Sequence, residues 1–239
     1  MNLIVDIGNS TSKAAVFDGD TMVARRRLGS HMADDLAMLA SEYSVGACAW
    51  ACVGPPHPEV KALLQQIART TLAINGSTPT PLTCDYHTPA TLGADRLAAA
   101  VGGAWIHPKT DLLIVDAGTC ITYDYVSAEA HYLGGNISPG LGMRLRALQQ
   151  QTARLPIVNA EGPLPYIGYD TSTAIRAGVT KGMLYEIRSY VDLFMQAHPN
   201  GHVFLTGGNA IRFAPQVTAE PCDTLVETGI NQILLHNNR

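Results

Sequence analysis

Two short segments place a carboxylate, a glycine and several hydrogen-bond donors directly after an apolar run. They are DIGNSTSK (residues 6–13) and DAGTC (residues 116–120). Glycine lets the backbone approach a ligand closely, and clustered donors suit phosphate oxygens, which accept many short hydrogen bonds. A carboxylate beside such a loop suits Mg²⁺, directly or through water. Two loops facing each other would hold the phosphates of one nucleotide between two halves of the chain.

Either loop alone has a plainer interpretation as a tight β-turn in which Asp and Asn satisfy backbone groups. The repetition favours phosphate binding. LIVDIG (3–8) and LIVDAG (113–118) share the apolar run, the Asp and the Gly, and they begin 110 positions apart in a chain of 239 residues.

The elements that must position the loops repeat as well. Short apolar, β-branched runs predict buried strands at 2–6 and 112–116. Each is followed by two more strand-like runs joined by a turn, which predicts strands at 13–17, 21–28, 121–126 and 131–137. A further strand is expected from 202, running into a double glycine.

Helical patterns fill the gaps between these strands. We expect helices at 33–43, 57–68, 93–105, 139–152 and 170–198. Pro139 would open the fourth helix, because proline is tolerated at a first helical position. Asp170, Thr171 and Ser172 are candidate caps of the fifth. The polar, proline-bearing stretch near 108–111 predicts a boundary between domains 1–110 and 111–239.

Composition narrows the class of protein. A hydrophobic fraction of 46% with 15% charged residues is typical of a soluble globular protein. Sixteen basic against twenty acidic residues (net charge −4) argues against a nucleic-acid partner. Five cysteines without a CxxC pair indicate neither a zinc site nor a disulfide framework. No signal peptide or membrane-spanning run is visible, so we expect a cytoplasmic protein.

Several common catalytic motifs are missing. The sequence has no G-x-x-x-x-G-K-[ST] loop and no G-x-G-x-x-G after a strand, which excludes a P-loop enzyme and argues against a dinucleotide fold. It also has no G-x-S-x-G elbow and no H-E-x-x-H pair.

The motifs together resemble a known family. The doubled Asp-x-Gly hairpin is similar to the superfamily of acetate and sugar kinases, Hsp70 and actin. Within it, the chain resembles the type III pantothenate kinases. The matching stretches run in the family's order from residue 3 to about 210: DIGNSTSK (6–13), DYHTPATLGADR (85–96), VDAGTCITYD (115–124), YLGGNISPG (132–140), GYDTSTAIRAG (168–178) and TGG (206–208).

The resemblance implies an α/β fold of duplicated ribonuclease H-like (actin-like ATPase) domains, each a mixed sheet flanked by helices. It also implies ATP-dependent phosphorylation of pantothenate to 4'-phosphopantothenate, the first step of coenzyme A biosynthesis. A magnesium ion and a monovalent cation, potassium or ammonium, would assist. A homodimer is expected, with some pantothenate contacts crossing the interface.

Site residues carry over from the matched motifs. Asp95 would be the catalytic base, Asp6 would anchor magnesium and Asp116 the monovalent cation. The expected ATP-binding residues are Asp6, Ile7, Gly8, Asn9, Ser10, Thr11, Ser12, Lys13 and Thr119. The expected pantothenate-binding residues are Tyr86, Gly93, Ala94, Asp95, Arg96 and Thr171.

Structural alternatives remain open for most of these residues. Asp95 could simply favour a helix N-terminus, and Arg96 could form a structural salt bridge. Tyr86 could anchor a loop, and Thr171 is an ordinary N-cap candidate. Asp116 could instead hold a second magnesium ion or a bridging water.

Two functional alternatives keep the fold. One is a kinase of another small hydroxylated acceptor, and the other is a nucleotide-binding accessory regulator. The chain also departs from the family pattern at Cys120, where alanine is usual, and at Asp170, where asparagine is common. Both departures lie beside matched residues and bear on fine tuning.

Overall fold

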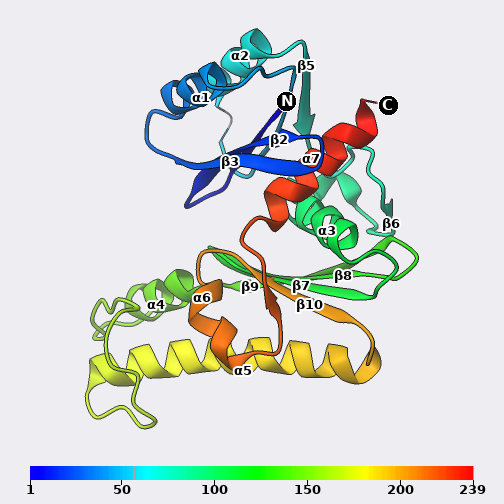
Figure 1. The fold of residues 1–239 in the computed structure, drawn as a ribbon. Helices are drawn as coiled ribbons and strands as arrows, with labels where there is room; N and C mark the ends of the chain where they lie inside the picture. The colour runs from blue at the N-terminus through cyan, green and yellow to red at the C-terminus, as the bar shows by residue number, and fades with distance from the viewer. Residues whose placement is uncertain (56, 239) are drawn as a thin grey trace. The chain divides into compact units, whose positions relative to one another are not determined.

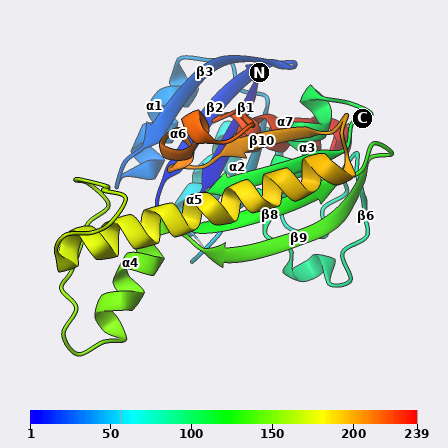
Figure 2. The ribbon, with the colours of Figure 1, turned by 90° about the horizontal axis from the view of Figure 1, so that it is seen from below.

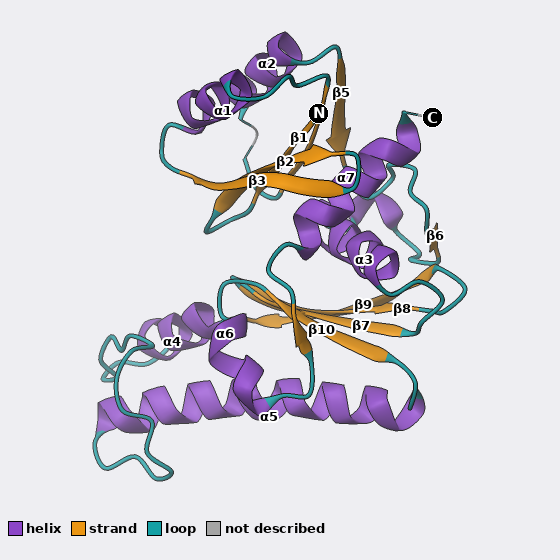
Figure 3. Ribbon diagram, viewed as in Figure 1, coloured by secondary structure: helices purple, strands orange, loops and turns teal. Residues whose placement is uncertain are grey.

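The computed structural model of the chain describes residues 1–55 and 57–238. The chain divides into two compact units, each containing a sheet flanked by helices (Figure 1, Figure 3). The first unit is Met1–Lys109 with Val126–Gly134 and Thr224–Arg239, and the second is Thr110–Tyr125 with Gly135–Asp223. The division into domains 1–110 and 111–239 stays a prediction, because compact units need not coincide with the halves of a duplication.

The sheet of the first unit has five strands in the order β3-β2-β1-β4-β5. They are β1 (Asn2–Ile7), β2 (Ser12–Asp18), β3 (Thr21–Leu28), β4 (Ala47–Cys52) and β5 (Thr70–Ile74). The pairs β1–β2 and β2–β3 are antiparallel, and β1–β4 and β4–β5 are parallel.

Helices cover both faces of this sheet. Side chains of a strand alternate between faces, so Leu3, Val5 and Ile7 of β1 share one face. They belong to one buried core with residues of α1 (Met32–Ser41) and α2 (Pro58–Ile67). On β1, β2 and β4 lies α7 (Leu225–Asn237), which also packs on α3 (Ala94–Ile106).

The helices α3 and α7 pack closely because each has a glycine where it contacts the other. A Cβ on Gly229 would lie 1.7 Å from the Ala98 carbonyl oxygen, and one on Gly102 would lie 2.2 Å from that of Leu225. The two helix backbones therefore touch, which fixes the helix that carries Asp95.

The second sheet has the order β11-β10-β7-β8-β9-β6. Its strands are β6 (Thr83–Cys84), β7 (Leu112–Ala117), β8 (Cys120–Val126), β9 (His131–Pro139), β10 (His202–Thr206) and β11 (Glu220–Pro221). The run β9-β8-β7-β10-β11 repeats β3-β2-β1-β4-β5 strand for strand, and β10 is parallel to β7 as β4 is to β1. The expected duplication and mixed α/β fold are confirmed.

The long helix α5 (Thr171–Ala197) runs along one face of this sheet (Figure 2). Leu113, Val115 and Ala117 of β7 belong to the same buried core as Met183 and Ile187 of α5. The helices α4 (Leu141–Gln150) and α6 (Ala210–Phe213) complete the second unit.

One expected helix start is wrong. Pro139 is the last residue of β9, and α4 begins at Leu141 with Gly140 as its N-cap. The Gly140 amide donates to the Thr119 carbonyl oxygen at 3.2 Å, which keeps the chain extended up to this point. The expected start of α5 is confirmed, because Asp170 accepts a hydrogen bond from the Thr173 amide in a capping box.

Candidate active site

The first loop joins β1 to β2 through a tight turn that faces solvent. Gly8 donates its amide hydrogen to the Thr11 carbonyl oxygen at 3.1 Å, and a Cβ on Gly8 would lie 2.9 Å from that oxygen. Asn9, Ser10 and Thr11 are exposed. The turn is therefore exposed to solvent, where its residues can meet a phosphate group.

Asp6 lies near the end of β1, and it is 9% exposed. In the sheet it is directly opposite Lys13 of β2 and Ala51 of β4. A carboxylate and an ammonium side chain thus sit on neighbouring strands at one face. Burial and the charge of Asp6 together raise the pKa of the Cys52 thiol. Ile7 is buried, so it can meet a nucleotide only through its backbone.

Asp95 is the second residue of α3, directly after Gly93 and Ala94. Its Oδ1 accepts a hydrogen bond from the Arg96 amide at 2.8 Å, and a Cβ on Gly93 would lie 2.5 Å from Oδ1. The carboxylate therefore folds back over the helix N-terminus, where a negative charge is stabilised. Arg96 is buried, at 7% exposure. This geometry suits both the structural and the catalytic interpretation of Asp95.

Tyr86 is fixed against the start of β9. Its ring makes an edge contact with Tyr132 at 6.2 Å between centroids, and it would meet a Cβ on Gly134 at 3.4 Å. Gly134 has a φ of +117°, which favours glycine. Asp85 pairs with the His131 ring at 3.0 Å and donates its amide to the Tyr132 carbonyl oxygen. The loop is thus anchored, whereas the Tyr86 hydroxyl has no hydrogen-bond partner among the described residues.

The second loop is shorter, and the chain surrounds it more closely. Gly118 and Thr119 alone connect β7 to β8. A Cβ would lie 3.1 Å from Asp116 Oδ1 if placed on Gly118, and 2.2 Å if placed on Gly207, whose φ is +90°. Asn209 donates its amide to the Ala117 carbonyl oxygen at 2.9 Å. Two glycines thus form a cradle around the Asp116 carboxylate.

Thr171 is the first residue of α5 and is exposed. The N-cap is Asp170, so the alternative role of Thr171 as the cap is wrong. Hydrogen bonds from Thr173 lower the pKa of Asp170. An aspartate therefore caps this helix in the place where asparagine is common. Cys120 also fits its site, because its Sγ contacts Met143 Sδ at 3.8 Å.

Sequence reasoning missed the glycines that lie against Tyr86 and against the second loop. Gly134, Gly140 and Gly207 all stand in matched motifs, but their roles depend on contacts with Tyr86, Thr119 and Asp116. The one signal in the sequence was the glycines of those motifs, which allow the backbone to approach another group closely.

A sequence model of the type III pantothenate kinase family matches residues 2–193. Type III pantothenate kinases of Phocaeicola vulgatus and Bacteroides fragilis are 42% and 44% identical to the chain. The first match covers 100% of both chains, and the second covers 100% of this chain and 99% of the relative. The chain belongs to the type III pantothenate kinase family.

Solved structures agree on the fold that this family adopts. A candidate Baf-family transcriptional activator from Campylobacter jejuni has a TM-score of 0.62 at 22% identity, covering 99% of this chain and 98% of that one. A candidate N-acetylmannosamine kinase from Listeria monocytogenes has a TM-score of 0.58 at 14% identity, covering 100% and 99%. At these identities the likeness concerns the fold alone. Among the described residues, no helix has the length and hydropathy needed to cross a bilayer.

Proposed function

We propose that the chain transfers the γ-phosphoryl group of ATP to the primary hydroxyl of pantothenate, giving 4'-phosphopantothenate for coenzyme A biosynthesis. The observation that carries the proposal is family membership over nearly the whole chain, with the GADR motif intact at the start of α3. Phosphoryl transfer needs an aligned nucleophile and neutralised phosphate charge. The chain offers groups for both.

Asp95 is the proposed base. Its Oδ1 is held by the Arg96 amide, and Oδ2 has no hydrogen-bond partner among the described residues. That second oxygen is therefore available to accept the proton of a substrate hydroxyl. The bond from the Arg96 amide fixes the carboxylate in place, so the structural role supports the catalytic one.

The two loops are proposed to bind ATP. The exposed turn Asn9–Thr11, with Lys13 and Thr119, would donate to phosphate oxygens. Asp6 would hold magnesium, which supplies neutralisation of phosphate charge when bound. A buried carboxylate at a strand end, beside a loop of donors, fits this role.

Asp116 is proposed to hold potassium or ammonium. The glycine cradle leaves its carboxylate accessible where a Cβ would block it. The Ala117 and Thr119 carbonyl oxygens accept hydrogen bonds from the Asn209 and Gly140 backbone amides. A carboxylate together with backbone carbonyl oxygens, each with two lone pairs, suits a large and weakly hydrated cation.

Pantothenate is proposed to meet Tyr86, the Gly93–Arg96 segment and Thr171. The free hydroxyl of Tyr86 and the exposed hydroxyl of Thr171 are available as donors. Arg96 would pair with the pantothenate carboxylate, and Gly93 would allow the backbone to approach. Arg96 is buried, so pantothenate would have to enter the site to reach it.

A homodimer is proposed through the α4–α5 face. A groove of about 510 Å³ lies there, lined by Leu148, Ala174, Gly178 and other residues of both helices. A Cβ on Gly178 or Gly182 would meet nothing within 4 Å, so another helix has room to approach. A neighbouring hollow shares Leu148 and Ala174 and reaches Thr171. Light scattering that gives a single-chain mass would contradict the dimer.

The function is tested by incubating the purified chain with pantothenate, ATP and magnesium, in potassium and separately in sodium. We expect a product with the mass of 4'-phosphopantothenate, in larger amount with potassium. Equal product in both salts would remove the proposed cation site at Asp116. No product in either salt, with ATP still bound, would favour another acceptor or a regulator. A cytoplasmic location is also proposed. The proposed reaction needs ATP, and the cytoplasm provides ATP and keeps thiols reduced.

A further inference from the structure

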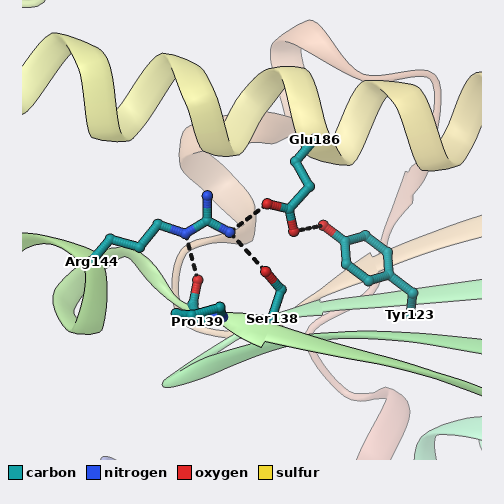
Figure 4. Close-up of polar contacts among 5 residues, drawn as sticks. All are labelled: Tyr123, Ser138, Pro139, Arg144 and Glu186. Carbon is teal, nitrogen blue, oxygen red and sulfur yellow. Dashed lines mark hydrogen bonds and ion pairs between the residues drawn. The ribbon is translucent and has the colours of Figure 1, made fainter. Parts of the chain in front are cut away.

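A polar cluster lies inside the second unit, between α5 and the end of β9 (Figure 4). Glu186, in the middle of α5, accepts a hydrogen bond from the Tyr123 hydroxyl at 2.9 Å and an ion-pair contact from Arg144 of α4. Tyr123 is fully buried and stacks on Tyr190 at 3.7 Å between ring centroids. The cluster therefore fixes the Glu186 carboxylate from the sheet side.

Charge in the cluster is balanced. Burial by itself raises the pKa of Glu186. Hydrogen bonds from Arg144, Ser138 and Tyr123 together lower this pKa by more than burial raises it, so the net pKa lies below that of a free glutamate. Burial and the bond to Glu186 raise the pKa of the Tyr123 hydroxyl. Glu186 is therefore ionised and Tyr123 neutral near neutral pH, and Arg144 is held between fixed partners.

The Arg144 guanidinium also donates hydrogen bonds to the segment just before α4. Its Nε donates to the Pro139 carbonyl oxygen at 2.6 Å, and its Nη2 donates to Ser138 Oγ at 2.9 Å. Lysine could not make this set of bonds, because only the planar guanidinium presents several donors in fixed directions. The ion pair with Glu186 thus fixes the guanidinium that grips the end of β9.

The gripped segment in turn supports the second loop. Gly140, next to Pro139, donates its amide to the Thr119 carbonyl oxygen, and a Cβ on Gly140 would lie 2.3 Å from that oxygen. Backbone therefore lies against backbone at this point. Any shift of the Ser138–Gly140 segment is transmitted to Gly118 and Thr119, the turn that follows Asp116.

We propose that Arg144 and Glu186 are positioning residues for nucleotide and cation binding, acting through the Ser138–Gly140 segment on the turn at Gly118–Thr119. The inference rests on the proposed role of that turn in binding ATP. It differs from a purely stabilising ion pair between α4 and α5, because it requires an effect on nucleotide affinity.

The test is calorimetric titration of each variant with magnesium and a non-hydrolysable ATP analogue, in potassium and in sodium. Arg144→Lys keeps a positive charge beside Glu186 but loses the fork that reaches Pro139. We expect it to weaken nucleotide affinity in potassium by about fivefold, with little change in the unfolding temperature. Glu186→Gln should weaken affinity in the same direction, because the guanidinium loses its fixed partner.

Arg188→Gln is the matched control. Arg188 lies two residues beyond Glu186 on α5, and its Nε donates to the Gln216 carbonyl oxygen at 2.8 Å. It should bind nucleotide as the wild type does. Arg144→Lys with affinity equal to that of Arg188→Gln would overturn the inference, even if Glu186→Gln proved too unstable to measure. The titration uses no pantothenate. Absence of pantothenate turnover would therefore count against the proposed function, but it would not change the measured nucleotide affinities.

Discussion

The loop after β1 and the loop after β7 follow equivalent strands in two sheets that share one order over five strands, but they are built differently. The first is a turn of four residues in which the Gly8 amide donates to the Thr11 carbonyl oxygen. The second has two residues and depends on Gly140, Gly207 and Asn209 from elsewhere in its unit. The first loop can therefore adjust by itself, whereas the second changes only with its neighbours.

A variant outside both loops supplies the reference for this comparison. Asp95→Asn keeps the size of the side chain and removes the proposed base, so we expect turnover to fall by about 10²–10⁴-fold. Nucleotide affinity by calorimetry should stay at the wild-type level, because neither loop is touched. Near-normal turnover would remove Asp95 as the base.

The second loop should be the more fragile of the two. Gly207→Ala places a Cβ 2.2 Å from Asp116 Oδ1 at a φ of +90°, so the Asp116 carboxylate or the backbone must move. We expect a stability loss of about 1–3 kcal/mol, measured by denaturant unfolding. Activation by potassium should also be lost.

Gly208→Ala is the control, because a Cβ there would meet nothing within 4 Å and its φ lies outside the left-handed region. If both alanine variants keep wild-type stability and potassium activation, the cradle around Asp116 is not required.

The same substitution in the first loop should cost less. A Cβ on Gly8 would approach the Thr11 carbonyl oxygen to 2.9 Å, but the turn faces solvent and can relax. We expect Gly8→Ala to raise the KM for ATP by about two- to fivefold and to change the free energy of unfolding by less than about 1 kcal/mol. An effect as large as that of Gly207→Ala would mean that the first loop is as constrained as the second.

The smallest expected effect is that of acid on the second loop, which acts through Glu186 and has a defined direction. The pKa of Glu186 is lowered in the folded state, so its ionised form stabilises the fold above the pKa of a free glutamate, about 4.3. That contribution is lost as pH falls through the lower, folded-state pKa. The difference in unfolding temperature between the wild type and Glu186→Gln should therefore be full at pH 7 and shrink as the pH falls below the pKa of a free glutamate. A difference that grows on acidification would contradict the direction given for Glu186.

Local patterns were enough for much of the fold. Short apolar runs and the turns between them located β1 to β3 and β7 to β9, and the Asp170 cap located the start of α5, because each depends on residues within a few positions. They did not predict α7. Its Glu227 and Asn231 are fully buried, which is unfavourable unless partners exist.

Those partners come from the other end of the chain. Glu227 is bonded by Arg25 Nε at 2.8 Å. Asn231 bonds Asn2 and the Gly19 carbonyl oxygen, and Gln232 bonds Asp20. About two hundred residues separate each pair, so no local pattern could reveal that these side chains find hydrogen-bond partners in the interior.

The candidate site shows the same contrast between local sequence patterns and contacts between distant segments. The amino-acid sequence by itself determined which residues we propose for the chemistry, because Asp6, Asp95 and Asp116 stand in short motifs at strand ends and a helix start. Only the tertiary structure decided what fixes them: Gly207 against Asp116, and Gly140 and Arg144 behind Thr119. The physical reason is that motif chemistry resides in contiguous residues, whereas the position of a group depends on close packing and hydrogen bonds between segments distant in the chain.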